Sequence, residues 1–415
     1  MKEIVKHKIK HNLNRLKASV KWVIFAILSG LIVGGVGTLF YFSMEVVTLV
    51  RTKHPEIIFL LPVGGIVIVG CYRLLHDDKD TGTNLVLSAI HSGEKLPLRM
   101  APLIFISTLI THLFGGSAGR EGAALQLGGS IGNGLGRLFR FDEKDKHIMI
   151  MCGMSAAFST LFGTPMAAAI FSMEVVSVGI MYYAALVPCV VSSLVAHAVA
   201  SSFGISPEAF PLKSFPAFQT ENAVLISILA VLCAGISILF CILLHQSEIV
   251  YKKLFKNPYL RVFAGGCMIV VLTLFVGDQT YNGTGMSVIA GCMKGSVPPE
   301  AFLLKMVFTA LTLGAGYKGG EIVPAFFIGA ALGCAAGPLL GLDPGFAAAV
   351  GLVALFCGVV NCPVASIVLS VELFGGGGLW FFALACGVSY LMSGYYTLYA
   401  EQHILYAKLG RKEES

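Results

Sequence analysis

Long apolar stretches separated by short breaks that contain glycine and proline dominate the hydropathy pattern of this 415-residue chain. The clearest apolar runs cover residues 22–41, 57–72, 223–244, 262–276 and 379–391. A helix that crosses a bilayer needs about 20 apolar residues, and several of these runs are shorter. Apolar helices that stop partway are typical of membrane transporters, in which broken helices surround a buried site. The pattern therefore predicts an all-α, polytopic membrane protein with interrupted helices.

Composition supports a membrane location for these runs. Hydrophobic residues make up 56% of the chain and charged residues only 13%. A soluble protein of this length needs more charge to cover its surface, and a β-barrel shows alternation in place of long apolar runs. Eleven cysteines are scattered through apolar sequence without a CxxC pair or a metal-ligand spacing. We therefore predict free core thiols, no metal site and no cofactor.

Basic residues gather at both ends of the chain: Lys2, Lys6, Lys8, Lys10, Arg15, Lys17 and Lys21 at the start, and Lys408, Arg411 and Lys412 at the end. Cytoplasmic segments of membrane proteins carry an excess of Lys and Arg, so both termini are predicted to be cytoplasmic, with residues 1–20 as a basic segment. No basic patch is interleaved with aromatic residues, which argues against a nucleic-acid partner. The first apolar run has spanning length and no small-residue cleavage site, so no cleavable signal is expected.

Three blocks of sequence occur twice, in the same order and about 200 residues apart. They are Gly82-Thr83 with Gly283-Thr284, Gly119-Arg120-Glu121 with Gly319-Gly320-Glu321, and Pro165 with Pro363, each proline being followed after nine residues by Glu174 or Glu372. The constant offset indicates a first transmembrane repeat at 21–205, a linker at 206–221, a second repeat at 222–394, and a C-terminal helix end and cytoplasmic tail at 395–415. Duplicated halves with interrupted helices predict a transporter or channel whose site lies at the repeat interface.

Glu121 and Glu321 each follow a glycine break inside apolar sequence. A carboxylate at membrane depth is costly and usually marks an ion or proton pathway. A broken helix presents free N–H groups and the positive end of its dipole, which favours an anion over a metal as cargo. Glu121, when ionised, would occupy such a site itself and, when protonated, would leave it, which suits it to proton-coupled anion transfer. For Glu321 the alternative role is to accept hydrogen bonds from local N–H groups.

The segment Gly119-Arg120-Glu121-Gly122, with Gln126 to Gly132 behind it, resembles the gating-glutamate motif of the CLC chloride channel and transporter family. The resemblance extends to the two repeated proline blocks and to the Gly-x-x-x-Pro motif that ends at Pro324, and it covers most of residues 81–399. It implies a CLC-type fold with two inverted-topology repeats and broken, re-entrant helices. The family fold is a homodimer in which each subunit has its own pore.

The resemblance also implies roles for particular residues. Glu121 is the external gate, and Tyr399 or a neighbouring tyrosine lines the central anion site. The implied anion-binding residues are Thr83, Asn84, Gly119, Arg120, Gly122, Ile322, Val323 and Tyr399, and the structural repeat motif comprises Pro165, Glu174, Pro324, Pro363 and Glu372. From the residues themselves we expect Glu174 and Glu372 to bond to backbone N–H groups or cap a helix end, and His112 to be a packed histidine. Thr83 either contacts the ion or bonds back to its own helix.

Departures from the pattern of chloride-transporting members make this chain similar to the fluoride-exporting branch, whose members resemble proton-coupled antiporters. Val175 stands where a second glutamate, the internal proton acceptor, is usual; Thr83 replaces the central serine, Ala123 a proline, and Glu321 an apolar residue. Val323 departs from the threonine that is more usual in that branch. Fluoride is a strong hydrogen-bond acceptor, so its site must offer helix N–H groups and hydroxyls. Glu321 would then serve in place of the absent internal acid.

The sequence therefore predicts a fluoride/proton antiporter in which Glu121 and Glu321 gate and transfer protons. It is expected to lie in membrane lipid as a multi-pass protein of a bacterial inner membrane. A chloride/proton antiporter or a passive chloride channel on the same fold is the alternative, and a small-molecule transporter of another family would require the repeats to be accidental. An intramembrane hydrolase is disfavoured because the chain has no HExxH, GxSxG or Gly-x-Gly-Asp motif, so no catalytic residue is predicted.

Overall fold

The computed structural model describes residues 2–75, 82–212 and 214–408, with side chains from residue 19 onward. Thr81, Arg411, Lys412 and the side chains of the basic segment before residue 19 lie outside the described part of the chain. The predicted cytoplasmic ends therefore stay predictions. The described residues form sixteen α-helices and two short strands.

Eight helices belong to each half of the chain. The first half contains α1 (Lys2–Lys53), α2 (Leu61–Leu74), α3 (Thr83–His91), α4 (Met100–Leu113), α5 (Glu121–Leu138), α6 (Glu143–Phe162), α7 (Pro165–Glu174) and α8 (Leu186–Ser202). The second contains α9 (Thr220–Leu254), α10 (Pro258–Val276), α11 (Met286–Met293), α12 (Ala301–Ala315), α13 (Ile322–Ala336), α14 (Pro344–Val360), α15 (Pro363–Phe374) and α16 (Leu379–Met392). Strands β1 (Ser177–Val178) and β2 (His403–Ile404) pair in parallel, and short 3₁₀ helices include η1 (Pro55–Leu60).

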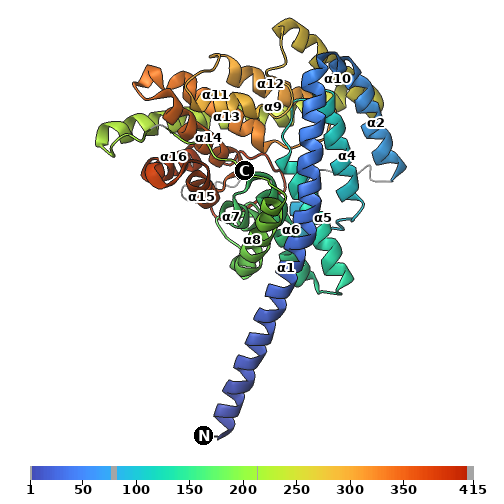
Figure 1. Cartoon of the computed structure of the whole chain (residues 1–415), viewed down its shortest axis with the longest axis vertical. Coiled ribbons are helices and arrows are strands. Elements are labelled where there is room, and N and C mark those ends of the chain that lie inside the picture. Colours follow the sequence, from blue (N-terminus) through green and yellow to red (C-terminus); the bar gives the residue numbers. More distant parts are fainter. Residues whose placement is uncertain (1, 76–81, 213, 409–415) are drawn as a thin grey trace.

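The helices of the second half repeat those of the first in order. Equivalent neighbours pack together, as α5 on α6 and α13 on α14, α6 on α8 and α14 on α16, and α1 on α6 and α9 on α14. Equivalent helices also touch across the halves, α2 with α10 and α7 with α15. Figure 1 shows the halves, blue to green and yellow to red, side by side, with α1 extending past the rest at its N-terminal end. The predicted duplication is thus present in the fold.

Several helices are too short to cross a membrane alone. In the described part of the chain, five segments are long and apolar enough to span: Ser19–Lys53, Pro55–Leu74, Tyr183–Ser202, Thr220–Leu254 and Pro258–Val276. Six further apolar helices have only 10–17 residues. The breaks predicted from glycine and proline set these ends. Gly163 and Asn361, both left-handed, end α6 and α14, and Pro165 and Pro363 begin α7 and α15. The prediction of an all-α membrane protein with interrupted helices is confirmed.

Two boundaries differ from those drawn on the sequence. Gly82 (φ 69°) directly precedes α3, and Gly285 (φ 80°) directly precedes α11. The glycine that precedes α11 is therefore two residues beyond Gly283, the glycine matched with Gly82 on the sequence. The linker predicted at 206–221 corresponds to residues 203–219 between α8 and α9, because α8 ends at Ser202 and α9 already begins at Thr220.

Glycines allow the paired helices of each half to touch backbone to backbone. A Cβ atom on Gly128 in α5 would lie 2.1 Å from the carbonyl oxygen of Gly153 in α6. In the second half, a Cβ on Gly329 in α13 would lie 2.4 Å from the carbonyl oxygen of Gly351 in α14. Small residues are enriched at such contacts in membranes, where close packing replaces the hydrophobic driving force. These contacts hold the starts of α5 and α13 in place.

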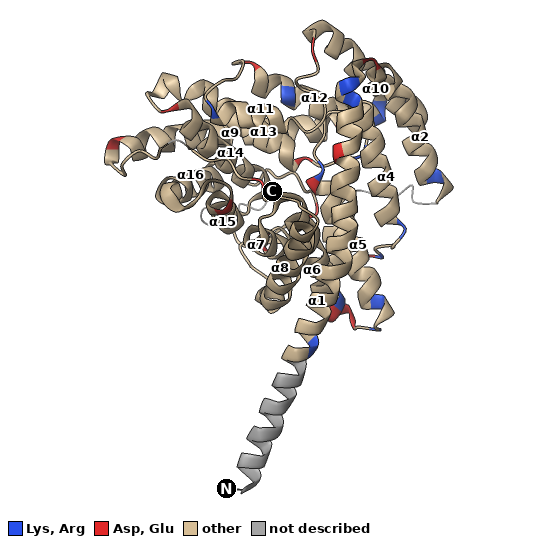
Figure 2. Ribbon diagram, viewed as in Figure 1, with Lys and Arg blue, Asp and Glu red and all other residues tan. Residues whose placement is uncertain are grey.

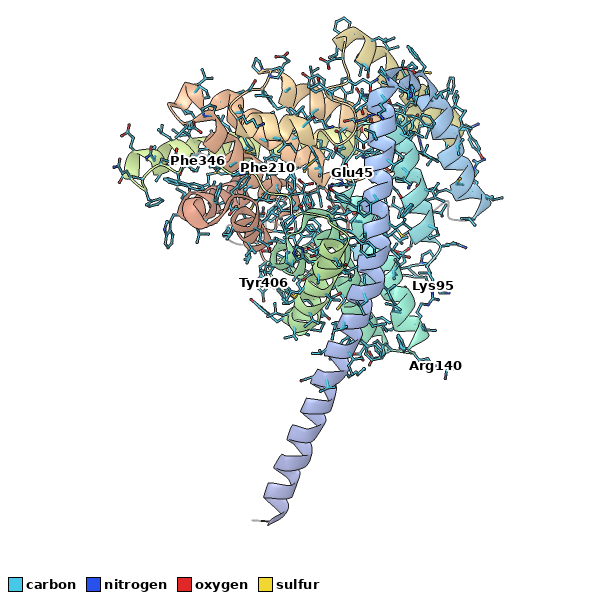
Figure 3. All side chains as sticks on the ribbon, in the orientation of Figure 1. Glu45, Lys95, Arg140, Phe210, Phe346 and Tyr406 are labelled. Atoms are coloured by element: carbon cyan, nitrogen blue, oxygen red, sulfur yellow. The ribbon has the colours of Figure 1, made fainter. Side chains whose placement is uncertain are left out.

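Charged residues are sparse along the helices and lie mostly near helix ends and in loops (Figure 2). Lys95 and Arg140, for example, are exposed at the rim of the first half (Figure 3). Arg120 and Glu121 are among the few charged residues that are buried, and they lie next to each other where α5 begins. Burying charge at membrane depth is costly, so this place is the first candidate for the functional site.

Candidate ion-transfer site

The loops that lead into α5 and α13 pair with each other. The N–H of Gly119 donates to the carbonyl of Gly320, and the N–H of Gly320 donates to the carbonyl of Gly119, each at 2.7 Å, in an antiparallel bridge. The first turns of both helices therefore meet between the halves, and each brings one glutamate. First-turn N–H groups have no partner within their own helix, so the junction presents donors and two dipole ends that attract anions.

Glu121 is the first residue of α5 and is fully buried. Its Oε2 accepts a hydrogen bond from the backbone N–H of Arg120 at 2.9 Å, and its Oε1 lies 3.4 Å from the Nε of Arg120. Oε1 accepts no hydrogen bond from the described residues. The carboxylate thus occupies the positive end of its own helix, with one oxygen left for a proton or a ligand.

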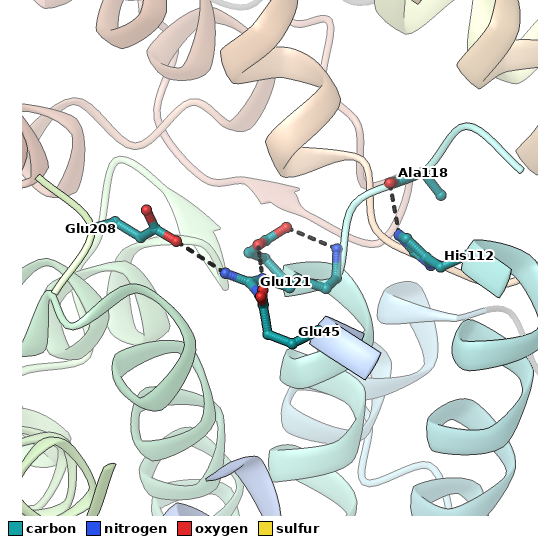
Figure 4. A network of polar contacts seen from close by, with 6 residues as sticks. Glu45, His112, Ala118, Glu121 and Glu208 are labelled. Carbon is teal, nitrogen blue, oxygen red and sulfur yellow. Dashed lines mark hydrogen bonds and ion pairs between the residues drawn. The ribbon is translucent and has the colours of Figure 1, made fainter. Parts of the chain in front are cut away.

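The guanidinium of Arg120 lies among three carboxylates, those of Glu45, Glu121 and Glu208, which are labelled in Figure 4. Nη2 is 3.1 Å from Glu208 and Nη1 is 3.8 Å from Glu45, while its Cζ lies 4.8 Å from the ring centroid of Tyr41. Arg120 was predicted to bind an anion, but carboxylates of the protein already balance the charge of its guanidinium. Sequence reasoning missed Glu45 and Glu208. Glu45 could have been noticed as a lone acid within an apolar run, whereas the sequence of the linker gives no signal for Glu208.

Glu321 lies at the start of α13, and its side chain makes no capping bond to that helix. Its Oε2 is buried and has no hydrogen-bond partner among the described residues. A Cβ on Gly122 would lie 3.1 Å from this oxygen and 3.6 Å from the hydroxyl oxygen of Thr83. The absent side chain of Gly122 thus leaves space in which the Glu321 carboxyl and the Thr83 hydroxyl both face the first turn of α5.

Thr83 is buried at the start of α3, and its hydroxyl oxygen accepts a hydrogen bond from Nε2 of Gln126 at 3.3 Å. The hydroxyl is therefore held by α5 and keeps its own proton for donation. Gln126 belongs to the motif behind the gate, but its contact with Thr83 was not foreseen. Asn84, predicted with Thr83, has a different role in the fold: its Oδ1 accepts a hydrogen bond from the Glu401 N–H at 3.2 Å and fastens the C-terminal segment to α3.

Tyr399 supplies a second hydroxyl that the sequence predicts at the ion site. It is 1% exposed, and its hydroxyl has no hydrogen-bond partner in the described part of the chain. Tyr395 and Tyr396, by contrast, are 45% and 48% exposed. Among these three tyrosines, Tyr399 is therefore the one with a buried hydroxyl that is free to donate.

Several buried polar atoms near the junction lack a partner in the described structure: Glu121 Oε1, Glu321 Oε2, Gln126 Oε1 and the Tyr399 hydroxyl. A buried group left unsatisfied costs about 1–3 kcal/mol, so native proteins keep few without a use. The set combines a hydroxyl donor with two carboxyls that can carry protons. The buried residues Ile322 and Val323 add first-turn N–H groups of α13. This is the chemistry needed to dehydrate an anion next to a transferable proton.

Glu174 and Glu372 cap each other's helices. Glu174, at the end of α7, accepts hydrogen bonds from two first-turn N–H groups of α15 at 3.1 and 2.7 Å. Glu372 in α15 accepts two from the first turn of α7, at 2.9 and 2.8 Å. Both carboxylates thus act as helix caps that join the halves. Val175, next to Glu174, is buried and offers no proton acceptor.

Two further side chains have structural surroundings. The ring nitrogens of buried His112 lie 2.8 Å from the Thr108 carbonyl oxygen and 3.0 Å from that of Ala118 (Figure 4), which is the setting of a packed histidine. The ring of Pro324 packs 3.0 Å from the position of a Cβ on Gly119. The described residues contain no group of three or more His, Cys, Asp or Glu side chains suited to a metal ion.

Comparison with known proteins extends over nearly the whole chain. A chloride/fluoride channel protein of Pseudomonas syringae pv. tomato is 38% identical over 418 residues, 98% of this chain and 91% of that protein. An H⁺/Cl⁻ exchange transporter of Vibrio cholerae is 26% identical over 400 residues, 88% of this chain and 84% of that protein.

Solved structures show the same architecture. A CLC-type fluoride/proton antiporter superimposes with a TM-score of 0.90 at 32% identity, over 93% of this chain and 98% of that one. A slow cyanobacterial Cl⁻/H⁺ antiporter shares the fold with a TM-score of 0.77 at 20% identity, over 90% and 94%. The family model described as voltage gated chloride channel matches residues 64–394. The chain therefore belongs to the voltage-gated chloride channel family and has the CLC fold of membrane ion transporters.

Proposed function

We propose that this protein is a fluoride/proton antiporter that exports fluoride across a bacterial inner membrane. Two relatives that match more than nine-tenths of the chain support this, one a chloride/fluoride channel protein and the other a solved fluoride/proton antiporter. The H⁺/Cl⁻ exchange transporters are less similar. We further propose a homodimer in membrane lipid, with one pore in each subunit and both termini in the cytoplasm.

The observation that carries the proposal is the position of Glu321. Its unpartnered carboxyl oxygen faces Gly122, in the first turn of the helix that Glu121 begins. Burial favours the neutral form of a carboxyl, and a neutral carboxyl donates a strong hydrogen bond to fluoride. Chloride accepts hydrogen bonds more weakly, so it gains less from such a donor. An acid at this place thus favours fluoride and supplies the proton acceptor that Val175 cannot.

In the proposed cycle, fluoride reaches the junction between α3, α5 and α13 and exchanges water for the hydroxyls of Thr83 and Tyr399 and the free N–H groups. Glu121, while ionised, competes for the same dipole ends and closes the outer side. Protonation removes its attraction to the Arg120 N–H and the α5 dipole, so the carboxyl leaves and the anion passes outward. Glu321 then accepts the proton for release inward, which couples the two fluxes.

The test is fluoride efflux from reconstituted vesicles with simultaneous measurement of proton uptake. The native protein should move protons against fluoride, and Glu121→Gln, which cannot ionise, should abolish coupled exchange. Glu321→Gln should reduce proton movement at least tenfold. Glu143→Gln provides a matched control, because this acid is 69% exposed at the start of α6 and its ion pair with Lys146 involves neither glutamate.

Three results would overturn the proposal. Proton-coupled flux that is unchanged in Glu121→Gln would remove Glu121 from the gate. Fluoride flux in the native protein without opposing proton movement would indicate a channel. Chloride efflux as fast as fluoride efflux under the same gradient would favour the chloride/proton antiporter.

A further inference from the structure

A cavity of about 960 Å³ opens beside Arg120, on the same side as Glu45 and Glu208. The last turns of α1, the 3₁₀ helix η1, the end of α10 and the start of α11 line it. Arg120 connects this cavity to the gate, since its backbone N–H holds Glu121. The cavity is therefore one residue away from the gate along the chain.

Arg51 is the notable charge in this cavity. It lies in the last turn of α1, lines the cavity, and is only 8% exposed. A Cβ on Gly283 would lie 2.3 Å from its Nη1, so the guanidinium rests directly on the backbone of the loop before α11. Nη1 has no hydrogen-bond partner, and Arg51 forms no ion pair with a carboxylate in the described structure. A buried, unpaired cation is costly unless a ligand balances it.

The acids that line the same cavity have partners of their own. Glu45 and Glu208 pair with Arg120, Glu56 pairs with His54, and Asp278 accepts a hydrogen bond from the Thr280 N–H. None of these bonds involves Arg51. The four carboxylates that line the cavity are thus bonded elsewhere, and the Arg51 guanidinium has no bond to any of them.

A second buried cation adds to the positive charge at the same loop. Lys305 in α12 is 0% exposed, and its Nζ donates to the carbonyls of Tyr281 and Gly283 at 3.1 and 2.7 Å and to the Ser117 hydroxyl at 3.0 Å. It has no carboxylate partner among the described residues, and it bonds to the carbonyl of Gly283, the same residue against which the Arg51 guanidinium packs. Two like charges held near one another in a buried place repel, and a bound anion would offset that repulsion.

The start of α11 completes the set of donors. The helix has eight residues, its cap Gly285 supplies no side chain, and its first residues Met286 and Ser287 line the cavity. Gly285 occupies the place that Gly82 has before α3. The repeat thus gives the cavity the same kind of helix start that α3 gives the candidate site, with Arg51 as an additional charge.

We propose that this cavity is a second anion site, in which the Arg51 guanidinium and the first-turn N–H groups of α11 hold a small inorganic anion between the gate and bulk water. The site takes fluoride or chloride, and the open cavity lets the ion keep part of its hydration shell. It rests on the proposed function only in that the ion it holds is the transported one. A phosphate of a lipid headgroup shares the chemistry, and we commit to the inorganic ion because Arg120, whose backbone N–H bonds to Glu121, lines the same cavity.

The test is calorimetric titration of the purified full-length protein in phospholipid-free detergent with sodium fluoride, sodium chloride and, separately, glycerol phosphate, at constant ionic strength. Arg51→Met should weaken fluoride or chloride binding at one class of site at least tenfold, and Arg51→Lys, which keeps the charge but loses the planar fork, should weaken it less. Lys53→Met is the matched control. It removes one positive charge from the same last turn, but Lys53 is exposed and does not line the cavity.

The proposal fails if Arg51→Met binds both halides as the native protein does, if Lys53→Met weakens binding equally, or if glycerol phosphate alone binds. If Arg51→Met does not fold, the test uses Arg51→Lys. An affinity of Arg51→Lys for fluoride and chloride equal to that of the native protein would then show that the guanidinium does not hold the ion. Binding in detergent is measured without a proton gradient. A protein that binds at Arg51 but shows no proton-coupled flux would therefore contradict the proposed function and leave this site standing.

Discussion

Replacing Glu174 by alanine should lower the free energy of unfolding by about 3 kcal/mol. The carboxylate is 8% exposed and accepts hydrogen bonds from two first-turn N–H groups of α15 at 3.1 and 2.7 Å. Loss of one helix cap costs about 0.5–2 kcal/mol, and a buried donor left without a partner costs about 1–3 kcal/mol. Water reaches this place poorly, so the two losses are only partly relieved, and a total of about 3 kcal/mol follows.

The structure also ranks related substitutions. Glu174→Gln keeps one acceptor but loses the charge that complements the helix dipole, so it should cost about half as much. Glu372→Ala removes the equivalent cap from α7, but this carboxylate is only partly buried and water replaces its bonds, so we expect about 1 kcal/mol. Because the two caps share no N–H group, the double variant should be close to additive.

The measurement is equilibrium unfolding in mixed micelles, followed by the fluorescence of the two tryptophans. Glu143→Ala is the control, since it removes an acid from the first turn of α6 that is 69% exposed, and it should change stability little. The reasoning is refuted if Glu174→Ala costs no more than this control, or if Glu174→Ala and Glu372→Ala cost the same despite their different burial.

Two further predictions concern packing and pH. Gly128→Ala should abolish folding, because the new Cβ would lie 2.1 Å from a carbonyl oxygen of α6. Gly235→Ala is the control: its Cβ would have no atom within 4 Å, so this variant should fold normally and gain up to about 1 kcal/mol from helix propensity. Equal yields of monodisperse protein in detergent for the two variants would contradict the close contact. The pKa of His91 is lowered by its burial and by His403, whose ring stacks on it at 3.9 Å. His91 therefore binds a proton more readily once the C-terminal strand has separated from it, so the strand is fully stabilised above about pH 6.5 and loses this stability as the pH falls through the lower folded-state pKa of His91. Hydrogen-exchange protection of the Leu405 N–H, which bonds to the Val178 carbonyl, should drop over that range, and constant protection down to pH 5 would exclude the mechanism.

Much of the fold follows from local sequence features. Glycine and proline act on the residues next to them, so the breaks at Pro165 and Pro363 were predictable, as was the duplication of the blocks around them. The start of α11 at Met286, two residues later than the match of Gly82 with Gly283 indicates, was not predictable, because loop length leaves no regular pattern in sequence. The pairing of Arg120 with Glu45 and Glu208 was also beyond prediction, since it joins three segments that share no motif.

The sequence by itself determined that this chain is a duplicated membrane protein with two glutamates at glycine breaks, because hydropathy, periodicity and helix-breaking residues act over a few positions. The tertiary structure alone decided that the breaks pair through Gly119 and Gly320, and that the carboxyl of Glu321 faces the helix of Glu121. It also decided that Arg51 lies buried without a carboxylate partner in the described structure. Such contacts join residues up to about 230 positions apart, and only the packing of helices brings their charges close enough to interact.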